Sequence, residues 1–74
     1  MARVLHVLKG GDAGLAVATI ERQRAAGDEV TVALLGAAPA PPLPPGVALR
    51  RVPGEASWAE LLQLVFASDH VVTW

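Results

Sequence analysis

Apolar residues gather in four strand-length runs, at residues 3–8, 30–35, 47–52 and 70–74. The first two runs are almost unbroken, which is typical of strands buried on both faces of a parallel sheet. The third run contains Arg50 and Arg51 and is followed by Pro53. Charges and a proline are the features with which edge strands resist further pairing. We therefore expect four strands, with the third at an edge of the sheet.

Residues 13–26 have the signals of a first helix. Asp12 can act as an N-cap, and Gly27 suits the left-handed position that follows a helix. The apolar face of this helix is broad and includes several small residues. It comprises Leu15, Ala16, Thr19, Ile20 and Ala26. The alanines indicate a close approach of the helix to the sheet.

Residues 58–67 form the clearest predicted helix. Ser57 and Glu60 make a capping box ahead of an apolar run. The i, i+3, i+4, i+7 stripe comprises Trp58, Leu61, Leu62 and Val65, and Phe66 widens it. Leu64 falls outside this stripe, so we expect it to be available for an intermolecular contact. Phe66 and Trp74 are further candidate interface residues.

Five prolines stand within residues 39–45, which forbids a helix and favours an extended segment. At about 3.1 Å per residue, residues 36–46 can span roughly 30 Å and carry the chain back across the sheet. The simplest interpretation is a stiff crossover. The alternative is a docking segment for a groove that recognises polyproline.

The alternation of strands and helices predicts a single α/β domain over residues 1–74, with a small, mostly parallel four-stranded sheet in the order 3-2-1-4. This arrangement is half-Rossmann or flavodoxin-like. Right-handed crossovers place the two helices on opposite faces. The direction of the third strand is left open. One helix on each face is little cover for strands so apolar, which favours a partner chain.

Composition supports the same expectation. The 74 residues are 53% hydrophobic, more than a small monomer easily buries, so we expect a homo-oligomer or a hetero-complex. The net charge is −1 and the basic residues are scattered, which argues against direct binding of nucleic acid. No apolar run approaches the roughly 20 residues of a membrane span, and the start does not resemble a signal peptide. The expected location is the cytoplasm.

The turn after the first strand is the candidate ligand site, because ligands of α/β sheets bind at the carboxyl ends of the strands. Gly11 and Gly14 match the second and third glycines of G-x-G-x-x-G, but Lys9 stands in place of the first. Lys9, Gly10, Gly11 and Gly14 could hold an anion at a helix N-terminus. The alternative is a purely structural turn, in which the carboxylate of Asp12 already satisfies the backbone donors.

No residue set for catalysis emerges, so we expect neither enzymatic activity nor a cofactor. The chain has no cysteine, and two histidines are too few for a zinc cage. His6 is best explained as a core residue with one hydrogen bond, the alternative being a general base or ligand. His70 follows Asp69, which could orient its imidazole. Without a nucleophile nearby, that pair is more simply a helix end and a strand start.

Residues 56–66 followed by residues 70–74, which close on Trp74, resemble the end of the DsrH/TusB-type sulfur-relay proteins. Residues 4–9 are also similar to small DsrE-like proteins. The resemblance implies a DsrE-like α/β fold and an oligomer with sister subunits that pass persulfide sulfur between cysteines, in tRNA thiolation or sulfur oxidation. Lacking cysteine, this chain cannot carry a persulfide. The resemblance therefore implies a non-catalytic subunit.

A competing resemblance is to the first half of the amino-terminal domain of retaining glycosyltransferases of the GT-B fold. It rests on residues 3–8 with their Gly-rich turn and on residues 67–72. It implies an anion- or nucleotide-binding half-Rossmann module, without the half that binds a nucleotide sugar. The sequence leaves both hypotheses open.

Overall fold

A computed structural model of the chain describes residues 2–9, 14–36, 39–52, 54 and 57–74. Its elements, in chain order, are β1 (Arg3–Leu8), α1 (Gly14–Ala25), β2 (Glu29–Leu35), β3 (Ala48–Val52), α2 (Trp58–Ala67) and β4 (His70–Thr73). The four strands form one sheet in the order β3-β2-β1-β4, and every neighbouring pair is parallel. The predicted α/β fold class and strand order are confirmed, and the third strand is parallel.

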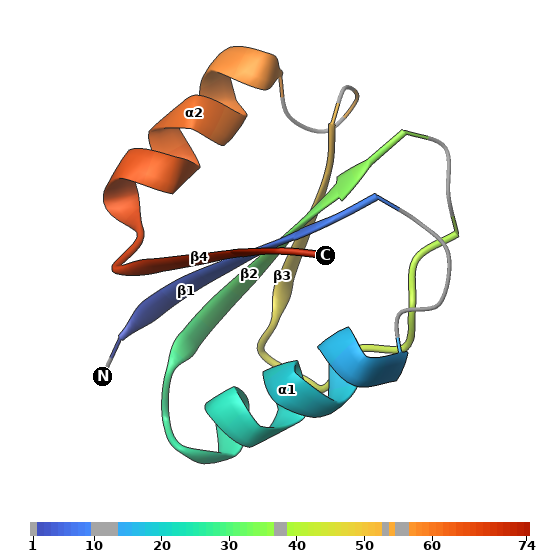
Figure 1. The fold of residues 1–74 in the computed structure, drawn as a ribbon, viewed down its shortest axis with the longest axis vertical. Helices are drawn as coiled ribbons and strands as arrows, with labels where there is room; N and C mark the ends of the chain where they lie inside the picture. The colour runs from blue at the N-terminus through green and yellow to red at the C-terminus, as the bar shows by residue number, and fades with distance from the viewer. Residues whose placement is uncertain (1, 10–13, 37–38, 53, 55–56) are drawn as a thin grey trace.

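The two helices lie on opposite faces of the sheet (Figure 1). Side chains alternate between the faces of a strand, so each strand contributes to two separate cores. The α1 face holds Ala16 and Ile20 from α1 against sheet residues that include Leu8, Val30 and Val32. The α2 face has a buried floor of Leu5, Val7, Ala33 and Val52.

Helix α1 ends at Ala25, one residue before the predicted end, and Gly27 takes the conformation predicted for it. Gly27 has φ 90°, the left-handed conformation that glycine adopts at lowest cost, and its N–H donates to Arg24 O at 3.0 Å. Fewer residues of α1 pack on the sheet than the apolar pattern of the sequence predicts. Ala16 and Ile20 are buried, whereas Leu15 is 71% exposed, so the expectation that Leu15 shares the packed face is wrong. The predicted cap, Asp12, lies outside the described residues.

The proline-rich segment does more than connect two strands. Leu43 and Val47, from the described residues 39–47, pack with Leu49 against the α1-face core. The segment therefore covers part of this face beside α1. The expectation that one helix alone covers each face is wrong for the α1 face, because an extended segment without a helix supplies the missing apolar cover.

We expect Gly46→Ala to destabilise the protein more than Gly27→Ala. Both glycines have positive φ, 89° and 90°, so each substitution costs about 1–2 kcal/mol in backbone conformation. At Gly46 the new Cβ would also stand 2.6 Å from Arg24 Nη2, whereas at Gly27 it meets nothing within 4 Å. Moving the guanidinium would break the bond from Arg24 Nη1 to Asp28 O (3.0 Å). Urea unfolding of both variants measures the difference, and equal losses would show that Arg24 gives way freely.

Candidate functional site

Helix α2 carries three of the six large apolar residues that are exposed in the described part of the chain. Trp58, Leu62 and Phe66 are 58%, 55% and 80% exposed. They recur at i, i+4 and i+8, so they lie one above another along one side of the helix. We call these three residues the α2 stripe. Extended apolar patches of this kind mark interaction sites on soluble proteins.

The inner side of α2 is formed by Leu61, Leu64 and Val65, which pack against the α2-face core. The predicted packed stripe is confirmed for Leu61 and Val65. It is wrong for Trp58 and Leu62, which are exposed, and for Leu64, which packs on the sheet although it was expected to be available for an intermolecular contact. The helix is apolar on both sides, and its ten residues include a single charge, Glu60. The spacing of apolar residues alone therefore does not determine which side of this helix packs on the sheet.

Ser57 is the N-cap of α2, so the N-cap half of the predicted capping box is confirmed. Ser57 Oγ accepts a hydrogen bond from Glu60 N–H at 3.2 Å and lies 3.4 Å from Glu60 Oε1. This cap fixes where the helix begins. Ser57 is used as a cap, as the sequence analysis expected.

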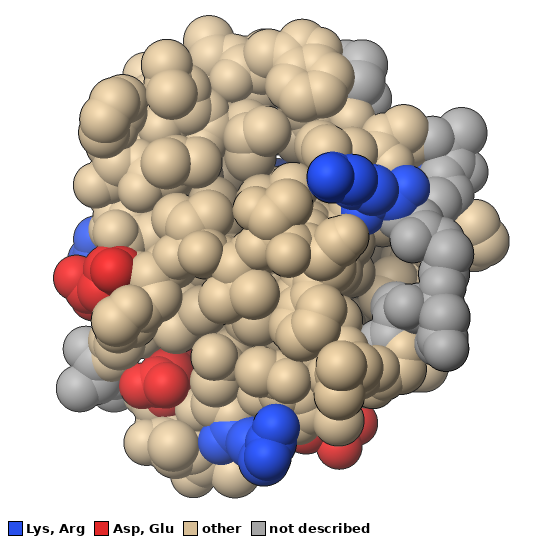
Figure 2. Space-filling view, viewed as in Figure 1, with Lys and Arg blue, Asp and Glu red and all other residues tan. Residues whose placement is uncertain are grey.

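Strand β4 forms one edge of the sheet and carries no charged residue. Val71 is 41% exposed, and Trp74, directly after the strand, is 38% exposed. The opposite edge, β3, carries Arg50 and Arg51. Figure 2, drawn from the same direction as Figure 1, shows a face whose charged side chains lie mainly toward its margins, with uncharged surface over α2 and β4.

His6 is fully buried in β1 and makes two side-chain hydrogen bonds. Its Nε2 lies 2.6 Å from Gln23 Oε1, and its Nδ1 lies 2.9 Å from Trp74 Nε1. An indole N–H can only donate, so Nδ1 accepts and Nε2 carries the proton that is donated to Gln23. The rings of His6 and Trp74 are inclined by only 16°, with centroids 6.0 Å apart.

With both nitrogens of His6 engaged, the histidine joins three elements: β1, α1 and the residue after β4. This arrangement favours the interpretation of His6 as a core residue, although it has two hydrogen-bond partners where the sequence analysis expected one. Gln23 was not singled out from the sequence. A polar residue on the inner line of α1, three positions after Ile20, is the signal that could have pointed to it.

The pair of Asp69 and His70 is held by the main chain. Asp69 Oδ2 accepts the Arg3 N–H at 2.8 Å, and Asp69 N–H donates to Arg3 O at 2.8 Å. These bonds fasten the start of β4 to the start of β1. They support the interpretation of this pair as a helix end and strand start.

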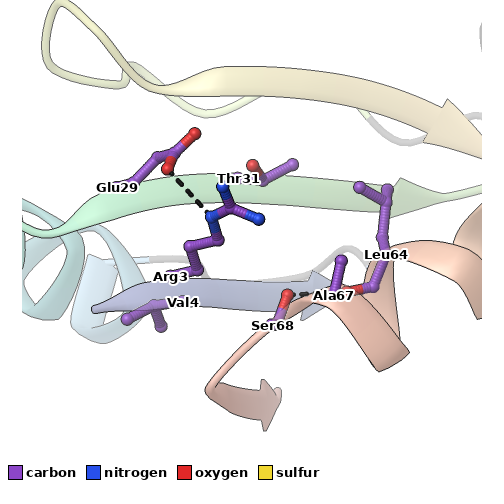
Figure 3. Close-up of a pocket in the computed structure, with 7 residues that line it drawn as sticks. All are labelled: Arg3, Val4, Glu29, Thr31, Leu64, Ala67 and Ser68. Carbon is purple, nitrogen blue, oxygen red and sulfur yellow. Dashed lines mark hydrogen bonds and ion pairs between the residues drawn. The ribbon is translucent and has the colours of Figure 1, made fainter. Parts of the chain in front are cut away.

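A cavity of about 240 Å³ lies at the amino ends of β1 and β2 (Figure 3). Leu64, Ala67 and Ser68 line one side, and the ion pair of Arg3 with Glu29 (3.3 Å) borders the other. Both charged side chains are largely exposed, so their pairing contributes little to stability. A second cavity of about 240 Å³, lined by Arg50, Glu60, Gln63, Leu64 and Ala67, continues along the same flank of α2.

Neither cavity coincides with the ligand site expected at the carboxyl ends of the strands. Each is also below the roughly 300–1,000 Å³ of typical small-molecule sites. Of the proposed anion-binding residues, Lys9 is exposed directly after β1 and Gly14 is the first residue of α1. Gly10 and Gly11 lie outside the described residues, so anion binding stays a prediction.

Within the described residues, no group of three or more His, Asp or Glu side chains could hold a metal ion. No described helix is long and apolar enough to span a membrane. Comparison of the chain with protein-family models, curated proteins and solved structures finds no match. The α2 stripe is therefore the surface from which a function can be argued.

Proposed function

We propose that this chain is a non-catalytic interaction module that binds a protein partner through the α2 stripe. The observation that carries the proposal is the exposure of Trp58, Leu62 and Phe66 on a helix whose other side already packs on the sheet. Burying a large apolar side chain contributes about 1.5–3 kcal/mol. Burial of all three residues against a partner would therefore contribute several kcal/mol of binding free energy. Tryptophan is also among the residues enriched in binding hot spots.

Apolar cover inside the domain supports the same proposal. The proline-rich segment and α1 cover one face, and α2 covers the floor of the other. The exposed apolar residues of α2 are therefore not needed to cover the sheet. They lie on the outer surface of the molecule, where a partner can reach them without rearrangement of the fold.

The specific setting that we propose is a cytoplasmic sulfur-relay assembly of the DsrE/DsrH type. Its support is the resemblance of residues 56–66 and 70–74 and the absence of cysteine, which suits a subunit that does not itself carry sulfur. In this setting a cysteine-bearing sister subunit performs the transfer. The alternative, an anion- or nucleotide-binding module, rests on Lys9, Gly10, Gly11 and Gly14.

Site-specific photo-crosslinking in the cells that produce the chain tests the interaction module. A photoreactive phenylalanine analogue at position 62 or 66 is expected to give an adduct of one discrete mass. The same analogue at Gln63, exposed on the other flank of α2, or at Leu15, exposed on α1, is expected to give none. Mass spectrometry of the adduct identifies the partner, and a cysteine-bearing sister protein would support the sulfur-relay setting. Equal labelling at all four positions, or none at 62 and 66, would overturn the proposed function.

A further inference from the structure

The exposed apolar residues are concentrated at one edge of the molecule. The six large ones in the described part of the chain are Leu15, Trp58, Leu62, Phe66, Val71 and Trp74. Leu15 belongs to α1, and the other five belong to α2, to the edge strand β4 or to the residue directly after β4. The distribution therefore favours the β4 edge over every other part of the described surface.

The orientation of α2 places the α2 stripe on the flank nearer β4. The cavity shared with β3 is lined by Glu60, Gln63 and Ala67, so these residues face β3. At 100° per residue, Trp58, Leu62 and Phe66 lie on roughly the opposite side of the helix axis. The α2 stripe therefore lies on the same side of the molecule as the open edge of β4. Figure 2 shows that the surface over α2 and β4 is largely uncharged.

The two edges of the sheet differ in their protection against pairing. Edge strands usually carry charges or proline that prevent a second chain from adding to the sheet. β3 has Arg50 and Arg51, whereas His70–Thr73 has no such residue. The Trp74 N–H donates to Val7 O (2.9 Å), so the alternation of peptide groups turns the N–H groups of Val71 and Thr73 away from β1.

We propose that the partner is a second copy of this chain, joined through antiparallel pairing of β4 with its equivalent across a two-fold axis. This inference rests on the proposed function and names its partner. A two-fold contact brings the same patch of both copies together, so an uncharged apolar patch is automatically complementary to itself. The result is a continuous eight-stranded sheet, since each copy contributes four strands.

The geometry of such a pair brings the two α2 stripes together. Helix α2 contacts β1, which lies one strand spacing of about 4.8 Å inside β4. Two helices seated over β1 of their own copies are then three strand spacings, about 14 Å, apart. That is wider than the 8–10 Å between closely packed helix axes, so large side chains must bridge the space. Trp58, Leu62 and Phe66 of both copies would fill the space between the helices, and Trp74 would be covered on the other face.

The apolar surface is large enough for this contact. With about 150–250 Å² for each aromatic side chain and somewhat less for Leu62 and Val71, the exposed fractions of the five residues give roughly 500 Å² of apolar side chain per copy. With the backbone of β4 and the polar rim, the interface reaches the lower end of stable protein contacts, about 1,200 Å² in total. The net charge of −1 per chain opposes the approach of a second copy only weakly.

Sedimentation and light scattering of the purified chain test the inference, with circular dichroism to confirm that each variant is folded. We expect a mass of two chains at micromolar concentration that falls to one chain on dilution. Leu62→Glu and Val71→Lys are each expected to shift the dimer dissociation constant upward at least tenfold. Leu15→Glu makes the same change at an exposed helical leucine away from this edge, and it is expected to leave the dimer intact.

Because the chain has no cysteine, a single Leu62→Cys substitution gives an independent test. A short bifunctional maleimide crosslinker is expected to join two Leu62→Cys chains and not two Leu15→Cys chains, and the absence of the Leu62→Cys product would contradict the pairing of the two α2 stripes. A monomer at all concentrations, or a dimer unaffected by Leu62→Glu or by Val71→Lys, would overturn the second-copy inference. If such a monomer still gives a discrete adduct with a different protein at positions 62 and 66, the proposed function stands. If it gives none, both fail.

Discussion

Ile20→Ala is expected to lower the free energy of unfolding by about 2–5 kcal/mol, the cost of removing a buried isoleucine from a packed core. Ile20 is fully buried, and with Ala16 it is the residue through which α1 enters the core of its face. A chain of this length has roughly 4–11 kcal/mol of stability in total. The substitution therefore removes a large part of it, and urea unfolding followed by circular dichroism measures the loss.

Leu15→Ala is the matched control, because it removes an aliphatic side chain five positions earlier on the same helix. Leu15 is mostly exposed, so its loss is expected to change stability by less than about 0.5 kcal/mol. If Ile20→Ala leaves too little folded protein to measure, Ile20→Val is expected to cost about 0.5–1.5 kcal/mol. Similar losses at positions 15 and 20 would contradict the packing of α1 described above.

The strand order could be predicted because its signals are local. The unbroken apolar runs of β1 and β2 fit only central strands of a parallel sheet. The charges of β3 exclude it from the centre. Short connections and right-handed crossovers then leave few topologies, and the structure has the one expected. The sequence did not determine the direction of β3, since the proline-rich segment is long enough to reach either end of the sheet.

The orientation of α2 could not be predicted because apolar residues surround most of this helix. Positions 58, 61, 62, 64, 65 and 66 are all apolar, and more than one helical face can be drawn through them. Contact with Leu5, Val7 and Ala33 on the sheet selects the face of Leu61, Leu64 and Val65. Composition alone indicated that the chain has more apolar residues than it can bury. Only the structure shows that three of them form the α2 stripe.

The partners of His6 were hidden for a different reason. Gln23 is 17 positions away in the sequence and Trp74 is 68 positions away, so no local pattern connects them. Their meeting follows from the sheet register, in which His6 is paired with Val72 and the strand carries Trp74 past the same face. A buried polar residue needs hydrogen-bond partners, which predicts that they exist but not which residues they are.

The bonds of His6 tie the chain's sheet to both its first helix and its last strand. β4 is short, with four residues paired only to β1 on its inner side. The Trp74 bond adds a side-chain anchor beyond the end of that pairing, next to the edge at which the second copy is proposed to join. A weaker anchor is therefore expected to loosen β4 before it loosens β1 or β2, where both sides of each strand are paired.

His6→Ala is expected to cost about 3–5 kcal/mol, because it leaves a cavity and removes the partners of both Gln23 Oε1 and Trp74 Nε1. Trp74→Phe removes only the donor to Nδ1 and keeps an aromatic ring, so its expected cost is about 1 kcal/mol. In a double-mutant cycle the two losses should fall short of additivity by about 1 kcal/mol. Trp58→Phe, at a tryptophan that is 58% exposed, is expected to cost less than about 0.5 kcal/mol and to be additive with His6→Ala.

Nitrogen NMR of the imidazole separates this hydrogen-bond network from simple packing. In the unmodified protein, Nε2 of His6 is expected to show the shift of a protonated nitrogen and Nδ1 that of an unprotonated one, since Nδ1 accepts from Trp74. Trp74→Phe should alter the Nδ1 shift, whereas Trp58→Phe should not. A proton found on Nδ1, or additive losses of unfolding free energy in the double-mutant cycle, would show that His6 and Trp74 are in contact without a hydrogen bond. In that case β4 would be held by its pairing with β1 alone.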